Sequence, residues 1–247
     1  MTSLKKKDEF EFFKFRAIGK HFVESLVTPQ LWFSTPQNLN DPFDCQINLE
    51  KSFRLAEAQT NDKQRTPIQK ILSNPECFRD WDARIQEVGI CSFSSNLLNT
   101  TMWAHYADEH RGACVLYRIP SEFLSAPKNR IIGTTSVVYQ DNRLIEWLKT
   151  DSLIDEDGEL SKDLLKISLT SKSPDWASES ELRIIRMEPG FLNIPPQFIQ
   201  QVCFGLRTST EDIRLIKSLA KDYCGCQIFV KIVRDEHSDF GLRVIEI

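Results

Sequence analysis

The sequence predicts a mixed α+β fold, with a mostly antiparallel sheet flanked by helices. Short apolar runs typical of strands recur along the whole chain, and helical patterns separate them at irregular intervals, whereas repeated βαβ units would be evenly spaced. No glycine-rich phosphate loop follows any of these runs, so a Rossmann or P-loop fold is not expected. With 247 residues, the chain is expected to form a single domain over residues 1–247 that buries its core without disulfides or metals.

In the N-terminal half, alternating apolar residues predict strands at 11–16, 31–34 and 89–95. Helical spacing of apolar residues predicts a helix over 19–28. Two prolines and an Asn-Asp-Pro turn predict a loop over 35–44. Residues 50–88 are polar and helical in pattern, which indicates a mainly helical insertion, with a helix start at Thr66-Pro67.

The C-terminal half continues the alternation. A helix over 101–108, ended near Arg111 and Gly112, leads into a strand at 113–119. Further strands are expected at 135–139 and 181–187, on either side of a mainly helical segment, 143–170, that an acidic turn at 155–159 interrupts. From residue 201 onwards, the pattern predicts a strand, a helix capped by Ser209, and two more strands.

Charge and cysteine content narrow the functional classes. The net charge of −4 gives no global indication of binding to nucleic acid or membrane. No apolar run approaches 18 residues and no secretory signal begins the chain, so a cytoplasmic protein without a membrane span is expected. The seven cysteines lie mostly among apolar neighbours, which favours buried free thiols. Cys224 and Cys226 lack a second cysteine pair, so no metal is expected there.

The stretch 101–117 concentrates reactive side chains. On a helix, His105 and His110 would lie about 140° apart, so they could not share a metal ion. His105 with Asp108 or Glu109 supplies two ligands, one fewer than a catalytic metal site needs.

Two other interpretations of this stretch remain. In one, His105 or Tyr106 lines a substrate pocket. In the other, the segment is a packed helix with His105 hydrogen-bonded at the edge of an apolar face formed by Met102, Trp103, Tyr106 and Ala107.

Three further signals each have a chemical and a structural interpretation. Glu179 and Glu181 could act in acid–base chemistry or hold a ribose hydroxyl, or could form a salt-bridged edge strand with Arg183. Arg16 could hold a phosphate with its guanidinium fork, or could be an exposed charge at a strand end. Ser92 and Ser94 alternate onto one face of a strand, where they could offer hydroxyls to a ligand or sit in a half-buried strand.

The loop Asn40 to Asp44 also has two interpretations. Asp41 and Asp44 place two acids on a rigid loop, as a metal-dependent nuclease or phosphodiesterase would need together with His105 and Asp108, although Asp41 could simply cap a turn. Alternatively, the loop is a structural plug, with Phe43 buried and with Asn40 and Asp44 bonding nearby backbone.

These motifs in combination resemble a widespread bacterial family that is classified only as a domain of unknown function. The resemblance rests on Phe33-Ser34 and on the motifs at 14–16, 40–44, 102–108 and 176–183. It covers most of the chain, with a departure at 91–94, where an extra residue interrupts the family's Cys-Phe-Ser motif.

A more distant resemblance is to arginine–serine–glutamate ADP-ribosyltransferases. An arginine in an early strand, a serine in a middle strand and Glu-x-Glu at a later strand occur here in the order of that group. The resemblance implies that Arg16 binds the dinucleotide NAD, that Ser92 or Ser94 supports the ribose pocket, and that Glu181 holds a ribose hydroxyl while Glu179 orients the acceptor. Lys14 or Arg111 could add positive charge near a pyrophosphate.

The expected function is therefore an ADP-ribosyltransferase-like or NAD-glycohydrolase activity, in the manner of a bacterial defence or toxin effector, with NAD as substrate and a protein or nucleic-acid acceptor left open. The alternatives are the nuclease described above and a non-enzymatic sensor or interaction module. Convergence of Asn40, Asp44, His105 and Glu181 in one open cleft would favour an enzyme. The expected catalytic residues are Glu181, Glu179 and His105, and the expected nucleotide-binding residues are Arg16, Ser92, Ser94, Tyr106, Asn40 and Asp44.

Overall fold

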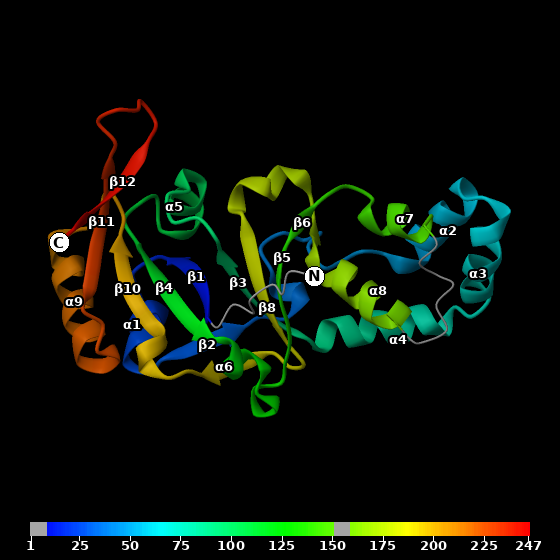
Figure 1. The fold of residues 1–247 in the computed structure, drawn as a ribbon, viewed down its shortest axis with the longest axis horizontal. Coiled ribbons are helices and arrows are strands. Elements are labelled where there is room, and N and C mark those ends of the chain that lie inside the picture. The colour runs from blue at the N-terminus through cyan, green and yellow to red at the C-terminus, as the bar shows by residue number, and fades with distance from the viewer. Residues whose placement is uncertain (1–8, 151–158) are drawn as a thin grey trace, which may run out of the picture.

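A computed structural model describes residues 9–150 and 159–247, and it centres on one eight-stranded sheet (Figure 1). The strand order is β12-β11-β10-β4-β1-β3-β8-β5, and every neighbouring pair is antiparallel except β10 and β11. The predicted α+β class is confirmed. The strands are β1 (Glu9–Arg16), β3 (Gly89–Ser94), β4 (Ala113–Pro120), β5 (Ile131–Ser136), β8 (Glu181–Arg186), β10 (Ile199–Phe204), β11 (Ile228–Arg234) and β12 (Leu242–Glu246).

The parallel pair is the part that the sequence predicted most fully. Helix α9 (Thr210–Cys224) connects β10 to β11, and the Ser209 side chain caps its start by accepting from the Asp212 amide. Gly225 ends the helix at φ 66°, a left-handed conformation that glycine adopts without strain.

The sheet is weakly joined at its middle. β1 pairs along its whole length with β4, and β3 pairs along its whole length with β8. Between β1 and β3, however, only Phe13 and Ser94 are in register. Beyond this pair, β3 is bridged instead to Ser34, through bonds of 2.9 and 2.8 Å between Ser34 and Ile90. The Lys14 ammonium donates to the Ser92 carbonyl (2.5 Å), so a side chain spans the place where ladder bonds are missing.

Helices cover both faces of the sheet and bury two apolar clusters. Helices α1 (Lys20–Val27) and α9 lie over one face, where the cluster includes Phe12, Phe22 and Tyr117. On the other face, α5 (Thr100–Tyr106) packs Trp103 against Phe15, with ring centroids 5.0 Å apart. Smaller elements complete this part: the two-stranded sheet of β2 (Gln30–Phe33) with β9 (Gly190–Asn193), and the helix α6 (Ser121–Ser125).

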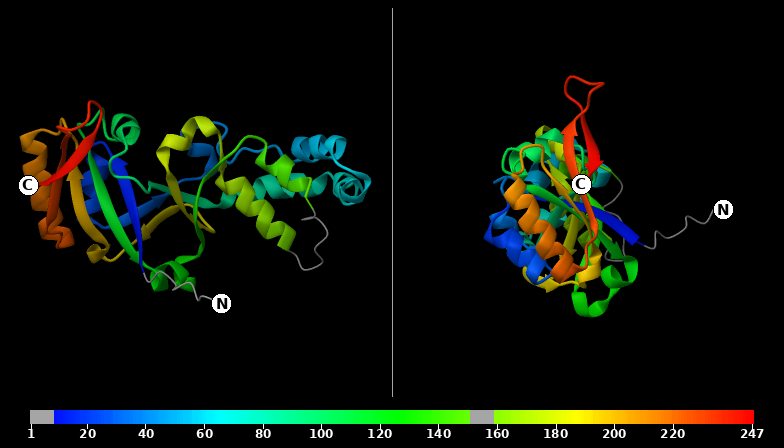
Figure 2. Two further views of the ribbon diagram at one scale, coloured as in Figure 1. Left: turned by 45° about the horizontal axis from the view of Figure 1, so that its top comes forward. Right: turned by 90° about the vertical axis from the view of Figure 1, so that its left-hand side faces the viewer.

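A second, mainly helical part lies at the end of the molecule away from α9 and β12 (Figures 1 and 2). The predicted helical segments 50–88 and 143–170 build it together, around a core that includes Phe53, Ile68 and Phe78. The acidic turn expected at 155–159 lies almost wholly outside the described residues. The helices are α2 (Leu49–Gln59), α3 (Asp62–Leu72), α4 (Glu76–Glu87), α7 (Arg143–Leu148) and α8 (Glu159–Thr170).

Two predicted boundaries in the outer segments are wrong. α3 begins at Asp62 rather than at Thr66-Pro67, because Asn61 caps it by accepting from the Gln64 amide; Pro67 then lies inside the helix. The strand expected at 135–139 is divided between β5 and the short strand β6 (Val138–Tyr139), which pairs with β7 (Ser171–Lys172). The loop expected at 35–44 is present, with one short 3₁₀ helix at Pro36–Asn38.

The helix expected over 101–108 ends earlier, at Tyr106. Asp108, Glu109 and His110 follow with φ values of 46°, 50° and 71°, which form a left-handed turn rather than a last helical turn. Bonds from the His110 amide to the Trp103 carbonyl (3.0 Å) and from the Gly112 amide to the Ala107 carbonyl (2.7 Å) close this turn. No helix in the described ranges is long and apolar enough to cross a bilayer.

Candidate functional site

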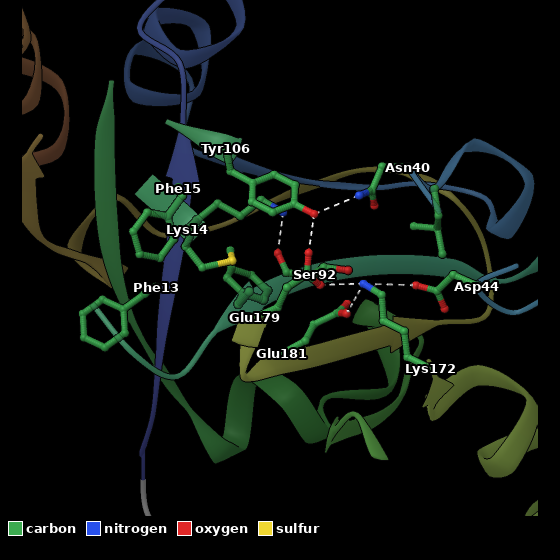
Figure 3. Close-up of a pocket in the computed structure, with 13 residues that line it drawn as sticks. Phe13, Lys14, Phe15, Asn40, Asp44, Ser92, Tyr106, Lys172, Glu179 and Glu181 are labelled. Atoms are coloured by element: carbon green, nitrogen blue, oxygen red, sulfur yellow. Dashed lines mark hydrogen bonds and ion pairs between the residues drawn. The ribbon is translucent and has the colours of Figure 1, made fainter. Parts of the chain in front are cut away.

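A small cavity of about 90 Å³ lies at the junction of β1, β3 and β8 (Figure 3). It is the place where residues from most of the predicted motifs come together. Polar and charged side chains predominate on one side, and apolar ones on the other. The lining residues are Phe13, Lys14, Phe15, Leu39, Asn40, Asp44, Ser92, Phe93, Met102, Tyr106, Lys172, Glu179 and Glu181.

Strand register fixes the face of the sheet from which each predicted residue leaves. Ser94 is in register with Phe13 on β1 and with Glu181 on β8, so all three side chains leave the same face of the sheet. Ser92, two residues along, shares that face. Arg16 lies three residues from Phe13, so it leaves the opposite face and lines a different cavity.

Lys172 lies at the centre of the polar side. Its ammonium is 2.5 Å from Glu179 Oε2, 3.0 Å from Glu181 Oε2 and 3.6 Å from Asp44 Oδ2, and its side chain is almost fully buried. Burial alone would lower the pKa of Lys172, but the carboxylates around it raise that pKa above its usual value. Sequence reasoning missed this lysine, because it lies in a polar segment with the pattern of an exposed loop.

Arg183 completes a buried charge network. It donates to Asp44 Oδ2 (2.5 Å), to Glu181 Oε1 (2.8 Å) and to the Leu169 carbonyl (2.8 Å), and it is 0% exposed. Its expected pairing with Glu181 is confirmed, but the expected edge strand is wrong, since β8 lies between β3 and β5.

The carboxylate of Glu181 is saturated with donors. Arg183 donates to both of its oxygens, Lys172 to one, and the Ser92 hydroxyl also bonds to it. Burial would raise the pKa of Glu181, but Arg183 and Lys172 lower it to about 2. Glu181 is therefore ionised at neutral pH.

Glu179 is bonded more sparsely. Tyr106 donates its hydroxyl proton to Glu179 Oε1, Lys172 donates to Oε2, and Asn40 donates to the Tyr106 oxygen (2.8 Å). Burial and the neighbouring Glu179 raise the pKa of Tyr106, so the phenol stays protonated. A carboxylate has about four acceptor positions. Glu179, unlike Glu181, therefore retains acceptor capacity beside the cavity.

Other predicted site residues lie elsewhere. His105 and Asp108 are exposed and do not line the cavity. The Ser94 hydroxyl is buried and donates to the Glu179 carbonyl (2.8 Å). Arg111 pairs with Glu109 at the surface. Across residues 9–150 and 159–247, no three His, Cys, Asp or Glu side chains are grouped to hold a metal ion.

The loop Asn40 to Asp44 is not the plug that one interpretation predicted. Phe43 is 82% exposed, and Asn40 and Asp44 bond side chains rather than nearby backbone. Asp41 accepts from the Phe43 amide (2.9 Å), so the prediction that it caps a turn is confirmed.

Comparison with known proteins identifies the central segment. Residues 102–184 match the model of a family described as "Protein of unknown function (DUF2971)". The resemblance to a domain of unknown function is thereby confirmed. The chain matches no curated protein, and it matches no solved structure.

The DUF2971 segment supplies only part of the cavity. Tyr106, Lys172, Glu179 and Glu181 lie within it, whereas the residues from β1, β3 and the Asn40–Asp44 loop precede it. The site therefore depends on chain outside the matched segment.

A larger cavity of about 690 Å³ adjoins the small one, and Asp44 and Lys172 line both. Its other residues come from the exposed Phe43, the start of α7 and the segment around Trp176. Its size falls in the range of pockets that bind small molecules, about 300–1,000 Å³. The ion pair between Asp44 and Lys172 therefore borders both cavities.

Proposed function

We propose that the protein consumes NAD at the small cavity, as an ADP-ribosyltransferase-like enzyme or an NAD glycohydrolase. The observation that carries the proposal is the convergence of three residues in one cavity: Ser92 from β3, Glu179 from the 3₁₀ helix Pro174–Glu179, and Glu181 from the start of β8. In the sheet, β3 with Ser92 lies between β1, which carries Lys14 and Arg16, and β8, which begins at Glu181.

The charges in the cavity suit the chemistry. When the bond between nicotinamide and ribose breaks, nicotinamide leaves with the bonding electrons and the ribose becomes cationic. The ionised Glu181 carboxylate, held in place by Arg183 and Lys172, would stabilise that positive charge. Glu179, with its spare acceptor positions, would orient a water molecule or an acceptor nucleophile and receive its proton.

In this proposal, each of the two cavities holds a different part of the NAD molecule. A cavity of about 90 Å³ has room for only about three water molecules, at roughly 30 Å³ each. It would take the reacting ribose only after side-chain movement, while the adjoining space of about 690 Å³ would receive the bulk of the dinucleotide. Lys14, which lines the small cavity, would supply the positive charge that the resemblance assigned to Arg16, which lines a different cavity.

The experiment is incubation of the purified protein with NAD, followed by measurement of free nicotinamide and of labelled acceptor. We expect Glu179→Gln to lower turnover by at least 100-fold, the order of effect of a lost general base. Glu211→Gln, on the exposed face of α9, is the matched control and retains full activity. Absence of both products with the wild-type protein would refute the proposal.

The same variant tests the biological setting. We place the protein in the cytoplasm, where NAD is available and its seven free cysteines stay reduced. An effector of bacterial defence would then deplete cellular NAD on expression, and the Glu179→Gln variant would not. Equal NAD levels in cells expressing either protein would contradict this role.

A non-enzymatic sensor or interaction module is the second candidate. It is favoured by the saturation of Glu181 and by the pairing of Arg183 with Asp44, which together resemble an internal support. Under this alternative, the wild-type protein releases no nicotinamide, and Glu179→Gln changes stability alone.

A further inference from the structure

Arg16 is an arginine without a partner in the part of the chain that the structure describes. It ends β1, in register with Ala113 on β4, and its side chain is only partly exposed. It forms no ion pair or hydrogen bond with the described residues, and its Nε is shielded from solvent with no acceptor in reach. A shielded donor without a partner costs about 1–3 kcal/mol, so such donors are usually satisfied by water or by a ligand.

Arg16 lines a defined cavity. This space of about 390 Å³ lies between the end of β1, helix α1 and the small sheet of β2 and β9. It is separate from the small cavity, because the two share no lining residue. The lining residues are Arg16, His21, Glu24, Ser25, Gln30, Trp32 and Phe191.

Two exposed aromatic rings form the outer wall of this cavity. Trp32 is 46% exposed and Phe191 is 60% exposed, and their ring centroids lie 4.6 Å apart on neighbouring strands. Large aromatic side chains exposed together beside a polar group are typical of a site that binds a flat ring.

The charge balance of the cavity favours an anion. Glu24 is its one carboxylate, and it is engaged with His21 Nδ1 at 3.1 Å and Lys20 Nζ at 3.8 Å. The Arg16 fork matches the geometry of phosphate and carboxylate groups, and within residues 9–150 and 159–247 no carboxylate is bonded to it.

We propose that this cavity binds an aromatic ring that carries a phosphate or a carboxylate. The acidic group binds the Arg16 guanidinium, and the ring packs against Trp32 and Phe191. The inference does not depend on the NAD chemistry proposed above.

Isothermal titration calorimetry tests the proposal with four probes: AMP, adenosine, benzoate and inorganic phosphate. AMP is expected to bind at least tenfold more tightly than adenosine or phosphate, because only AMP engages both the fork and the rings. Comparison of AMP with benzoate shows whether the site prefers a phosphate or a carboxylate. Failure of both AMP and benzoate to bind the wild-type protein at millimolar concentration would overturn the proposal.

Matched variants locate the site. Arg16→Gln is expected to weaken AMP binding at least tenfold and to leave adenosine binding unchanged, whereas Arg214→Gln on the exposed face of α9 changes neither. Trp32→Leu, at a position exposed enough to leave the fold intact, is expected to weaken both AMP and adenosine; Phe240→Leu, at a loop residue 90% exposed, is its control.

Glu179→Gln separates this site from the NAD cavity and is expected to bind AMP as the wild type does. AMP binding that survives Arg16→Gln but is lost in Glu179→Gln would overturn the assignment.

Discussion

At the scale of single residues, the charged side chains at the small cavity are buried as partners of one another. The cluster contains three acidic side chains, Asp44, Glu179 and Glu181. Two basic side chains, Lys172 and Arg183, form ion pairs with them. Burying any one of these charges alone would cost several kcal/mol, so each depends on its partners. The charges of the cluster therefore depend on one another, and Glu181 is the carboxylate with the most hydrogen bonds.

Removal of Arg183 is expected to be severe. Arg183→Leu leaves Asp44 and Glu181 buried without their main partner, and we expect a loss of about 3–5 kcal/mol in the free energy of unfolding. Arg118→Leu breaks only surface pairs with Glu9 and Glu11 and should cost less than about 1 kcal/mol. Urea denaturation of both variants measures the difference, and equal losses would show that the cluster contributes little.

Stability should also depend on pH through Glu181. Its folded pKa of about 2 lies below the ordinary value of 4.5, so its contribution is complete above about pH 4.5 and is lost as pH falls towards 2. The stability difference between the wild type and Glu181→Gln should therefore narrow across that window, with a slope of up to about 1.4 kcal/mol per pH unit. Denaturation midpoints at successive pH values check this, and a constant difference would contradict it.

The sequence revealed the acids of this cluster but not their partners. Glu179, Glu181 and Asp44 stand in motifs with recognisable spacing. Lys172 does not, because a lysine between serines has the pattern of a solvated loop until β7 and the carboxylates enclose it. Arg16 was predicted as a phosphate ligand together with Glu181, but strand alternation sends the two side chains to opposite faces. Pairing register across three strands is not encoded locally, so no single segment could have shown it.

At the scale of elements, the left-handed turn after α5 fixes how that helix meets the sheet. The turn carries His110, whose carbonyl accepts from the Arg207 amide (2.9 Å) beyond the end of β10. Close backbone approach makes two glycines necessary here: a Cβ on Gly112 would lie 2.2 Å from the Arg16 carbonyl oxygen, and one on Gly205 would lie 2.2 Å from the His110 carbonyl oxygen. The sequence predicted a break at Gly112 but gave no sign of three consecutive residues with positive φ.

A methyl group at Gly205 tests this contact. We expect Gly205→Ala to lose about 1–3 kcal/mol, because the atom it meets belongs to backbone that cannot rotate away. Gly133→Ala, on β5, meets nothing within 4 Å and serves as the control, with a change of less than about 1 kcal/mol. Thermal unfolding of the two variants gives the comparison; similar melting temperatures would mean that the turn adjusts freely.

At the scale of the whole molecule, two segments far apart in sequence form one helical part. Residues 50–88 and 143–170 were predicted helical from their patterns, but the patterns could not show that both bury their apolar sides in one core. The larger cavity is lined by residues of this helical part and of the segments on either side of it, so its shape depends on how the helices pack.

A core substitution tests whether the helical part unfolds independently of the central sheet. Phe53→Ala removes a fully buried ring that contacts Phe78, at a cost of about 3–5 kcal/mol locally. Hydrogen exchange measured by mass spectrometry should then rise in α2, α3, α4, α7 and α8 while the amides of β4 and β10 stay protected. Uniform acceleration across all these elements would mean that the protein opens as one unit.

The single register pair that joins β1 to β3 has a mechanical consequence. The sheet consists of two halves, one with the strands β12-β11-β10-β4-β1 and the other with β3-β8-β5. The register pair of Phe13 with Ser94 and the Lys14 side chain connect the two halves. Separation of β1 from β3 breaks few backbone hydrogen bonds, so it costs less free energy than separation of any fully paired strands of the sheet. A ligand that binds across β1 and β3 would hold the two strands together. The melting temperature of the protein should therefore be higher with that ligand bound than without it.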